Sequence, residues 1–98
     1  MILVTGAVFA RTETFEELRR LSLEHVHRSR NEPGCVSHDV HVDCENPLKL
    51  VFVERWENME TLRRHFRVPA AIAFVRAARR LSAASEAMTI YEAEAVEP

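Results

Sequence analysis

The stretch CVSHDVHVDCENPLKLVFVERW, residues 35–56, decides the fold of this chain. Apolar and polar side chains alternate over residues 35–43 and again over residues 48–56, with the period of two that a half-buried strand requires. A short polar turn containing Pro47 separates the two runs. Two alternating runs joined by so short a turn predict an antiparallel β-hairpin.

The segments before the hairpin predict a strand and a helix. The run Ile2–Ala10 is short, apolar and β-branched, which is typical of a strand. Thr14 with Glu17 three residues later forms a capping-box pattern, so a helix is expected from there to about Arg30. Gly34 accepts the positive φ of a sharp reversal, and the chain then turns into the hairpin.

The segments after the hairpin predict one broken helix and a last strand. Asn58 is a suitable cap for a second helix, which Pro69 breaks or re-starts before residues 70–81 continue it. Residues 87–96 alternate weakly and are expected to form the last strand.

The resulting order is strand, helix, strand, strand, helix, strand, which predicts an α+β fold of the ferredoxin-like, split β-α-β type. Its antiparallel sheet has both helices on one face. The strand of residues 48–56 is apolar on both faces, so the uncovered face is expected to meet a second copy. We therefore predict a homodimer, a dimeric α/β barrel formed by sheet-to-sheet packing.

Length and composition exclude several classes of protein. Ninety-eight residues, 47% hydrophobic and 29% charged, predict one globular domain over residues 1–98. The net charge of −2 gives no general attraction for nucleic acid. No apolar run is long enough to span a membrane, and the two cysteines have neither metal-site nor redox spacing, so we expect a cytoplasmic protein.

Glu54 and Trp56 share one face of their strand, and His65 follows on the next helix. A buried glutamate costs several kcal/mol unless it has a partner, so Glu54 either meets an arginine or a histidine, lines a wet pocket, or lies at an exposed strand end. For each residue alone, an ordinary structural role is the commoner outcome. Together they indicate a pocket between the sheet and the helix.

The spacing of the histidines argues against a metal site. His25 and His27 are about 200° apart on a helix of ~3.6 residues per turn, and His38 and His41 point to opposite faces of a strand. We therefore expect no metal ligands.

The chain resembles the antibiotic biosynthesis monooxygenase family, including its quinol monooxygenases. The resemblance covers most of the chain, and the order and spacing of its pieces are fairly specific. These pieces are Arg30-Asn31-Glu32-Pro33-Gly34-Cys35, then Asp43 and Pro47, then Val53-Glu54-Arg55-Trp56-Glu57, then His65-Phe66 and Pro69.

The resemblance implies a homodimer that oxidises a quinol, an anthrone or a similar aromatic small molecule with molecular oxygen, without metal, flavin or another cofactor. It implies that Trp56 lines the pocket, that Glu54 supports it by hydrogen bonding, and that His65 is the polar group on the helix side. The expected catalytic pair is His65, whose side chain is matched to proton transfer near neutral pH, and Glu54, which orients it or acts itself. The expected substrate-binding residues are Trp56, His38, Phe52 and Phe66. Haem degradation is disfavoured, because the first strand has Val4-Thr5-Gly6-Ala7 where that branch carries an asparagine.

Two other functions stay open at this point. A non-catalytic dimer that binds small ligands is one, because fold does not imply activity. The other is an oxygen-independent isomerase or lyase that uses the same acid and base. The sequence specifies neither the natural substrate nor whether the role is biosynthetic or the detoxification of quinones.

Overall fold

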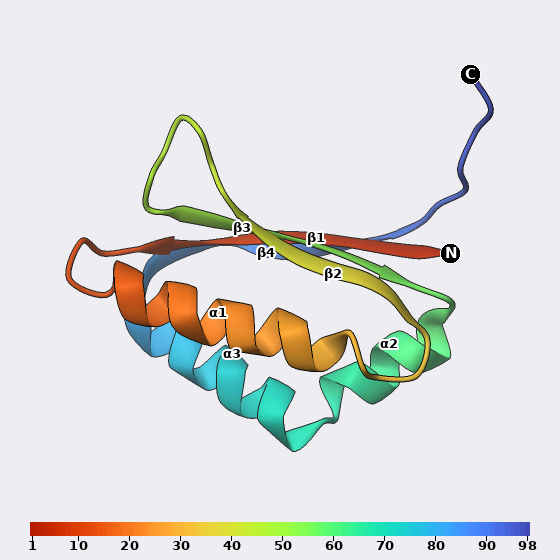
Figure 1. The fold of residues 1–98 in the computed structure, drawn as a ribbon, viewed down its shortest axis with the longest axis horizontal. Coiled ribbons are helices and arrows are strands. Elements are labelled where there is room, and N and C mark those ends of the chain that lie inside the picture. Colours follow the sequence, from red (N-terminus) through yellow and green to blue (C-terminus); the bar gives the residue numbers. More distant parts are fainter.

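A computed structural model describes all of residues 1–98, and its helices lie on one side of a single sheet (Figure 1). The elements follow in the order β1 (Ile2–Ala10), α1 (Phe15–Ser29), β2 (Cys35–Val42), β3 (Lys49–Trp56), α2 (Met59–Phe66), α3 (Pro69–Leu81) and β4 (Ser82–Glu92). None of the three helices combines the length and apolar character needed to cross a bilayer.

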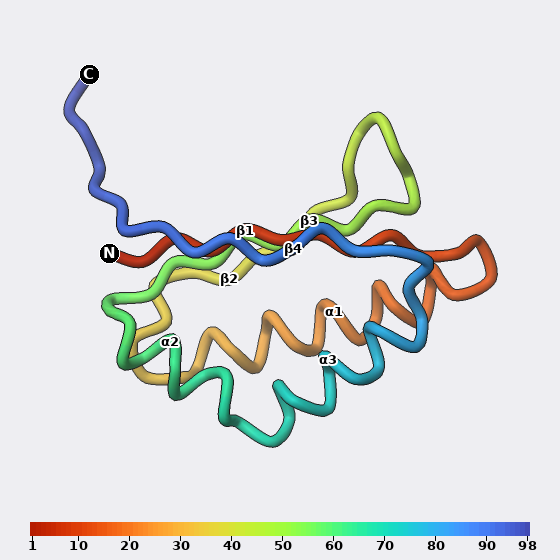
Figure 2. Tube along the Cα trace, turned by 180° about the vertical axis from the view of Figure 1, so that it is seen from behind, coloured from red at the N-terminus to blue at the C-terminus, as the bar shows by residue number.

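The four strands form an antiparallel sheet in the order β2-β3-β1-β4, which confirms the ferredoxin-like α+β fold. The predicted hairpin is β2 and β3, with His38 opposite Glu54 and Val40 opposite Phe52. Seen from behind, α1 and α3 run beneath the sheet and α2 lies near one end of them (Figure 2). The opposite face of the sheet carries no helix.

The predicted second helix is two helices. Asn58 caps α2 as expected, because its side-chain oxygen accepts a hydrogen bond from the Thr61 backbone N–H at 3.0 Å. Val68 has extended backbone angles, and Pro69 stands in the first turn of α3, where its missing N–H has no helical partner to lose. Pro69 therefore restarts the helix rather than kinking it.

The capping box predicted at Thr14 is wrong. The Thr14 hydroxyl makes no side-chain cap on α1 and instead donates to the Leu81 carbonyl at 2.6 Å, where α3 ends. The Thr14 hydroxyl oxygen also accepts a hydrogen bond of 3.0 Å from the Arg11 backbone N–H. The Thr14 hydroxyl therefore bonds to a residue 67 positions away instead of capping α1 as the local spacing predicts.

The last strand begins five residues before its predicted start and ends four residues before its predicted end, at Ser82 and Glu92 rather than at residues 87 and 96. Residues 82–86 are small or polar and show no apolar alternation, so the pattern does not reveal them. Backbone pairing defines them instead, since Ser82 lies opposite Ala10 and Glu86 opposite Ala7.

The core between sheet and helices has two apolar parts. The larger contains Leu18, Val26, Leu50, Phe52 and Leu81, with Ala10 and Ala78. The smaller contains Ile2, Val4, Trp56 and Leu62. Buried polar side chains lie against both parts, because His38 meets the Phe52 ring and His65 meets the Trp56 ring.

Candidate functional site

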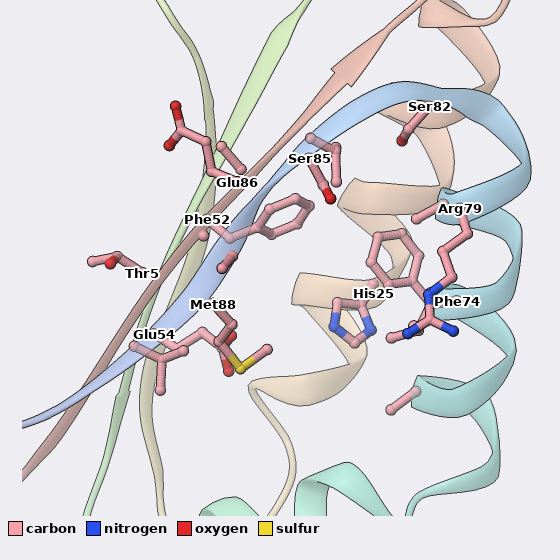
Figure 3. A pocket seen from close by; sticks show the side chains of 18 of the residues that line it. Thr5, His25, Phe52, Glu54, Phe74, Arg79, Ser82, Ser85, Glu86 and Met88 are labelled. Carbon is pink, nitrogen blue, oxygen red and sulfur yellow. The ribbon is translucent and has the colours of Figure 1, made fainter.

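A cavity of about 790 Å³ lies between the sheet and α3, with β1 and β4 forming much of its wall. Fourteen of its 25 lining residues are hydrophobic, and the volume is that of a site for a small organic molecule. Figure 3 shows His25 from α1 and Phe74 from α3 across the cavity from Phe52 and Met88.

A carboxylate and two histidines lie close together in this cavity wall. Glu54, on β3, is 5% exposed, and its Oε1 accepts a hydrogen bond of 3.0 Å from the Trp56 indole N–H. The Nε2 of His38 lies 3.7 Å from Glu54 Oε2, and the Nε2 of His65 lies 3.9 Å from Glu54 Oε1. Both separations exceed hydrogen-bond distance, so these atoms can still bind a ligand.

A second carboxylate orients His65. The Nδ1 of His65 lies 2.9 Å from Oε1 of Glu32, which follows α1 in the turn before β2. An ionised carboxylate only accepts, so in the neutral tautomer that fits this contact Nδ1 carries the ring proton and Nε2 has the free lone pair. Since His65 lines the cavity, the Nε2 lone pair is a candidate for the general base.

A third histidine, His25, joins the cluster from α1. Its ring stacks on Phe74 with centroids 4.2 Å apart and lies 5.1 Å from the ring of His38. Arg28 Nη2 donates to the Nδ1 of His25 at 2.7 Å, one helical turn further along α1. His25 therefore borders the cluster on the side of α1 and α3.

Burial decides the charges in this cluster. Removal from water disfavours the charged ring and lowers the pKa of His25 and of His38 to about 3, and the neighbouring histidines act in the same direction. Burial also raises the pKa of Glu54 above its usual value, against the lowering effect of the Trp56 hydrogen bond. At neutral pH, the rings of His25 and His38 are therefore uncharged.

The comparisons with known proteins agree with this fold. The family model described as antibiotic biosynthesis monooxygenase matches residues 1–77, which is more than half of the chain. The chain belongs to the antibiotic biosynthesis monooxygenase family.

Individual relatives of this family member cover nearly the whole chain. A crystal structure from Deinococcus radiodurans, provisionally named an antibiotic biosynthesis monooxygenase, matches with a TM-score of 0.94 and 27% identity, covering 100% of this chain and 98% of that one. Rv0793 from Mycobacterium tuberculosis matches with a TM-score of 0.89 at 22% identity over 99% and 98% of the two chains, a likeness of fold.

A relative found by sequence is the uncharacterized protein sll1783 of Synechocystis sp., which is 32% identical over 91 residues. The match covers 93% of the present chain and 62% of the relative. This member of the family therefore spans less than two thirds of the length of that protein.

The structure of this family member brings five of the six predicted site residues to the cavity. His65, Glu54, His38, Phe52 and Phe66 line it. Trp56 does not line it, because its side chain is 0% exposed and lies behind Glu54 and His65. Trp56 donates to Glu54 and packs against the His65 ring at 4.8 Å, so it supports the wall rather than facing a ligand.

Sequence reasoning missed Glu32, His25 and Phe74 as members of the site. Glu32 stands inside the Glu-Pro-Gly-Cys motif, which predicts the turn and belongs to the family resemblance but does not by itself indicate a site residue. His25 shares the buried side of α1 with Leu18 and Val26, so an ionisable residue on that side was the available signal. Phe74 gives no signal of its own, because an aromatic residue on a helix is ordinary core.

Proposed function

We propose that this chain is a monooxygenase that oxidises a quinol, an anthrone or a similar aromatic small molecule with molecular oxygen. Its family membership supports this reaction class. The observation that carries the proposal is the His65–Glu32 pair, whose free Nε2 lies beside a buried carboxylate in a largely apolar cavity.

The proposed chemistry begins with removal of a proton from the substrate. The Nε2 of His65, with Glu54 beside it, takes the proton of a phenol or of an activated methylene, and Glu32 stabilises the imidazolium that forms. The electron-rich anion then passes electrons to oxygen. For an anthrone, one oxygen atom becomes the new carbonyl, and the other leaves as water with the two methylene hydrogens.

The apolar wall confines the anion while this happens. Phe52, Phe66 and Phe74 offer ring surfaces to a flat substrate, and His38 adds a neutral acceptor for a second hydroxyl group. Exclusion of water favours reaction with oxygen over reprotonation.

Oxygen uptake by the purified protein tests the function. We expect uptake above the spontaneous rate with at least one member of a panel of hydroquinones, anthrones and naphthols, measured with an oxygen electrode. Heat-denatured protein is the blank for spontaneous oxidation. No uptake across the panel despite quenching of tryptophan fluorescence would indicate a binding protein, and product formation under nitrogen would indicate an isomerase or lyase.

We also propose that the functional unit is a homodimer joined through the uncovered sheet face. No element of the chain covers that face (Figure 1), and it carries Leu3, Phe9, Val51 and Val53 by strand alternation. Buried apolar area stabilises an interface by about 25 cal/mol per Å². Free Cys35 and Cys44 fit the reducing cytoplasm that we propose as its location.

Analytical ultracentrifugation at micromolar concentration tests the dimer. We expect wild-type protein to sediment at twice the 11.3 kDa chain mass and Val53→Glu to sediment as a monomer, because a carboxylate on this face would be buried without a partner. Ala73→Glu, which places the same charge at an exposed position of α3, is the matched control and should remain dimeric. Monomeric wild-type protein would refute the proposal.

A further inference from the structure

Three histidines that are far apart in the sequence meet at one point. His25 comes from α1, His38 from β2 and His65 from α2, and one ring nitrogen from each lies within 4.8 Å of the others. All three side chains are buried. Histidines that are neighbours within one helix or one strand of this chain cannot share an ion, but this set comes from three elements.

His38 is a buried polar side chain without a partner. It is 1% exposed, and neither of its ring nitrogens makes a hydrogen bond. A buried polar atom left unpaired costs about 1–3 kcal/mol, so an unpaired imidazole that lines a cavity points to a missing ligand.

We propose that His25, His38 and His65 form a binding site for a divalent transition-metal ion, with Glu54 as the fourth protein ligand. Imidazole nitrogens with one carboxylate suit ions such as Zn²⁺, Co²⁺ and Ni²⁺. Glu54 lies 3.7 Å from His38 and 3.9 Å from His65, so it borders the same point.

The surroundings of His65 are those of a metal ligand. Metal-bound histidines usually donate their other ring N–H to a carboxylate, and His65 has Glu32 in that position at 2.9 Å. Tetrahedral zinc with Zn–N bonds of about 2.0–2.1 Å needs nitrogens about 3.3 Å apart. The three ring nitrogens lie within 4.8 Å of one another, so binding requires the longest of these distances to shorten by up to about 1.5 Å. Small movements of the three side chains share this change.

Arg28 competes with the ion for His25. Its guanidinium donates to the Nδ1 of His25 at 2.7 Å, so in the ion-free protein that lone pair is taken and the ring proton is on Nε2. Binding through Nδ1 requires Arg28 to leave, and binding through Nε2 requires the proton to move to Nδ1, which also breaks this hydrogen bond. Removing Arg28 should therefore tighten binding.

The metal site goes beyond the proposed oxygenation and is tested without it. An ion would take the lone pairs of His65 and Glu54 that the proposed proton transfer uses, so turnover by that route belongs to the ion-free protein. Binding is measured without substrate, and its failure would leave the proposed oxygenation untouched.

Calorimetric titration of EDTA-treated, desalted protein with Zn²⁺ tests the site. We expect one ion per chain and micromolar or tighter affinity, while Mg²⁺, which prefers oxygen ligands, gives no heat. Co²⁺ should produce the visible absorption bands of a four- or five-coordinate ion. No Zn²⁺ heat and no Co²⁺ bands at about 0.1 mM ion would overturn the proposal.

Four variants separate this site from adventitious binding. His38→Phe should weaken Zn²⁺ binding by about 100-fold or more, and Glu32→Gln, which keeps the shape of the orienting side chain, by about tenfold. Arg28→Met should tighten binding by about tenfold, the equivalent of one hydrogen bond. His27→Gln removes an exposed histidine of α1 and should change nothing. Wild-type affinity in both His38→Phe and Glu32→Gln would contradict the assignment.

Discussion

Turnover should fall by about 10²–10⁴-fold when Glu54→Gln and His65→Asn are combined, because positioned acid–base groups contribute that much to a reaction rate. Both side chains line the cavity, and their nearest polar atoms are 3.9 Å apart. Glutamine keeps an acceptor for the Trp56 indole N–H, so the hydrogen bond behind the wall survives. The measurement is kcat/KM for oxygen uptake on the most active compound of the panel.

Two exposed positions provide matched controls for that result. Glu57→Gln removes a carboxylate just beyond β3, and His27→Gln removes a histidine from α1, both at exposed sites. Their kcat/KM should stay near the wild-type value. Unchanged turnover in a folded Glu54→Gln, His65→Asn protein would show that these two residues are not part of the mechanism.

Gly34→Ala should be the most destabilising single change in the turn before β2, at about 2–5 kcal/mol. Gly34 has φ of +82°, which side-chain-bearing residues rarely adopt. An added Cβ would also press against the Thr61 side chain, 2.7 Å from its Oγ1. The measurement is the urea midpoint, with the slope of the transition as a check on the two-state behaviour.

Gly6→Ala is the matched control for that substitution. Gly6 has no positive φ, and a Cβ added there would meet the Met88 Cα at 3.8 Å, an ordinary contact. Its free energy of unfolding should therefore change by only about 0.4–1 kcal/mol. Equal urea midpoints for the Gly34→Ala and wild-type proteins would show that the turn can relax around the methyl group.

The turn between α1 and β2 contains both Gly34, which affects stability, and Glu32, which contacts His65 in the site. Gly34 follows Glu32 by two residues, and its carbonyl accepts a hydrogen bond of 2.9 Å from the Glu57 backbone N–H. The turn is therefore tied to the end of β3 while it presents Glu32 to His65. This gives the Glu-Pro-Gly-Cys motif a physical role in aligning the proposed base.

Local patterns were sufficient for most of the fold. Alternation identified β2 and β3 to within one residue at each end, and the Asn58 cap located the start of α2. These features depend on residues a few positions apart, so the sequence displays them directly. The shared face of Glu54 and Trp56 followed from the same alternation, and their hydrogen bond of 3.0 Å is its result.

Long-range contacts decided the rest. The Thr14 hydroxyl binds the end of α3, residues 82–86 join the sheet only by pairing with β1, and Trp56 lies behind the cavity wall. By itself, the sequence determined the first three strands, the first helix, the order of the elements and the face that Glu54 shares with Trp56. Only the tertiary structure decided that His25, His38 and His65 meet, because they lie on three different elements and a local period specifies only the neighbours within one element.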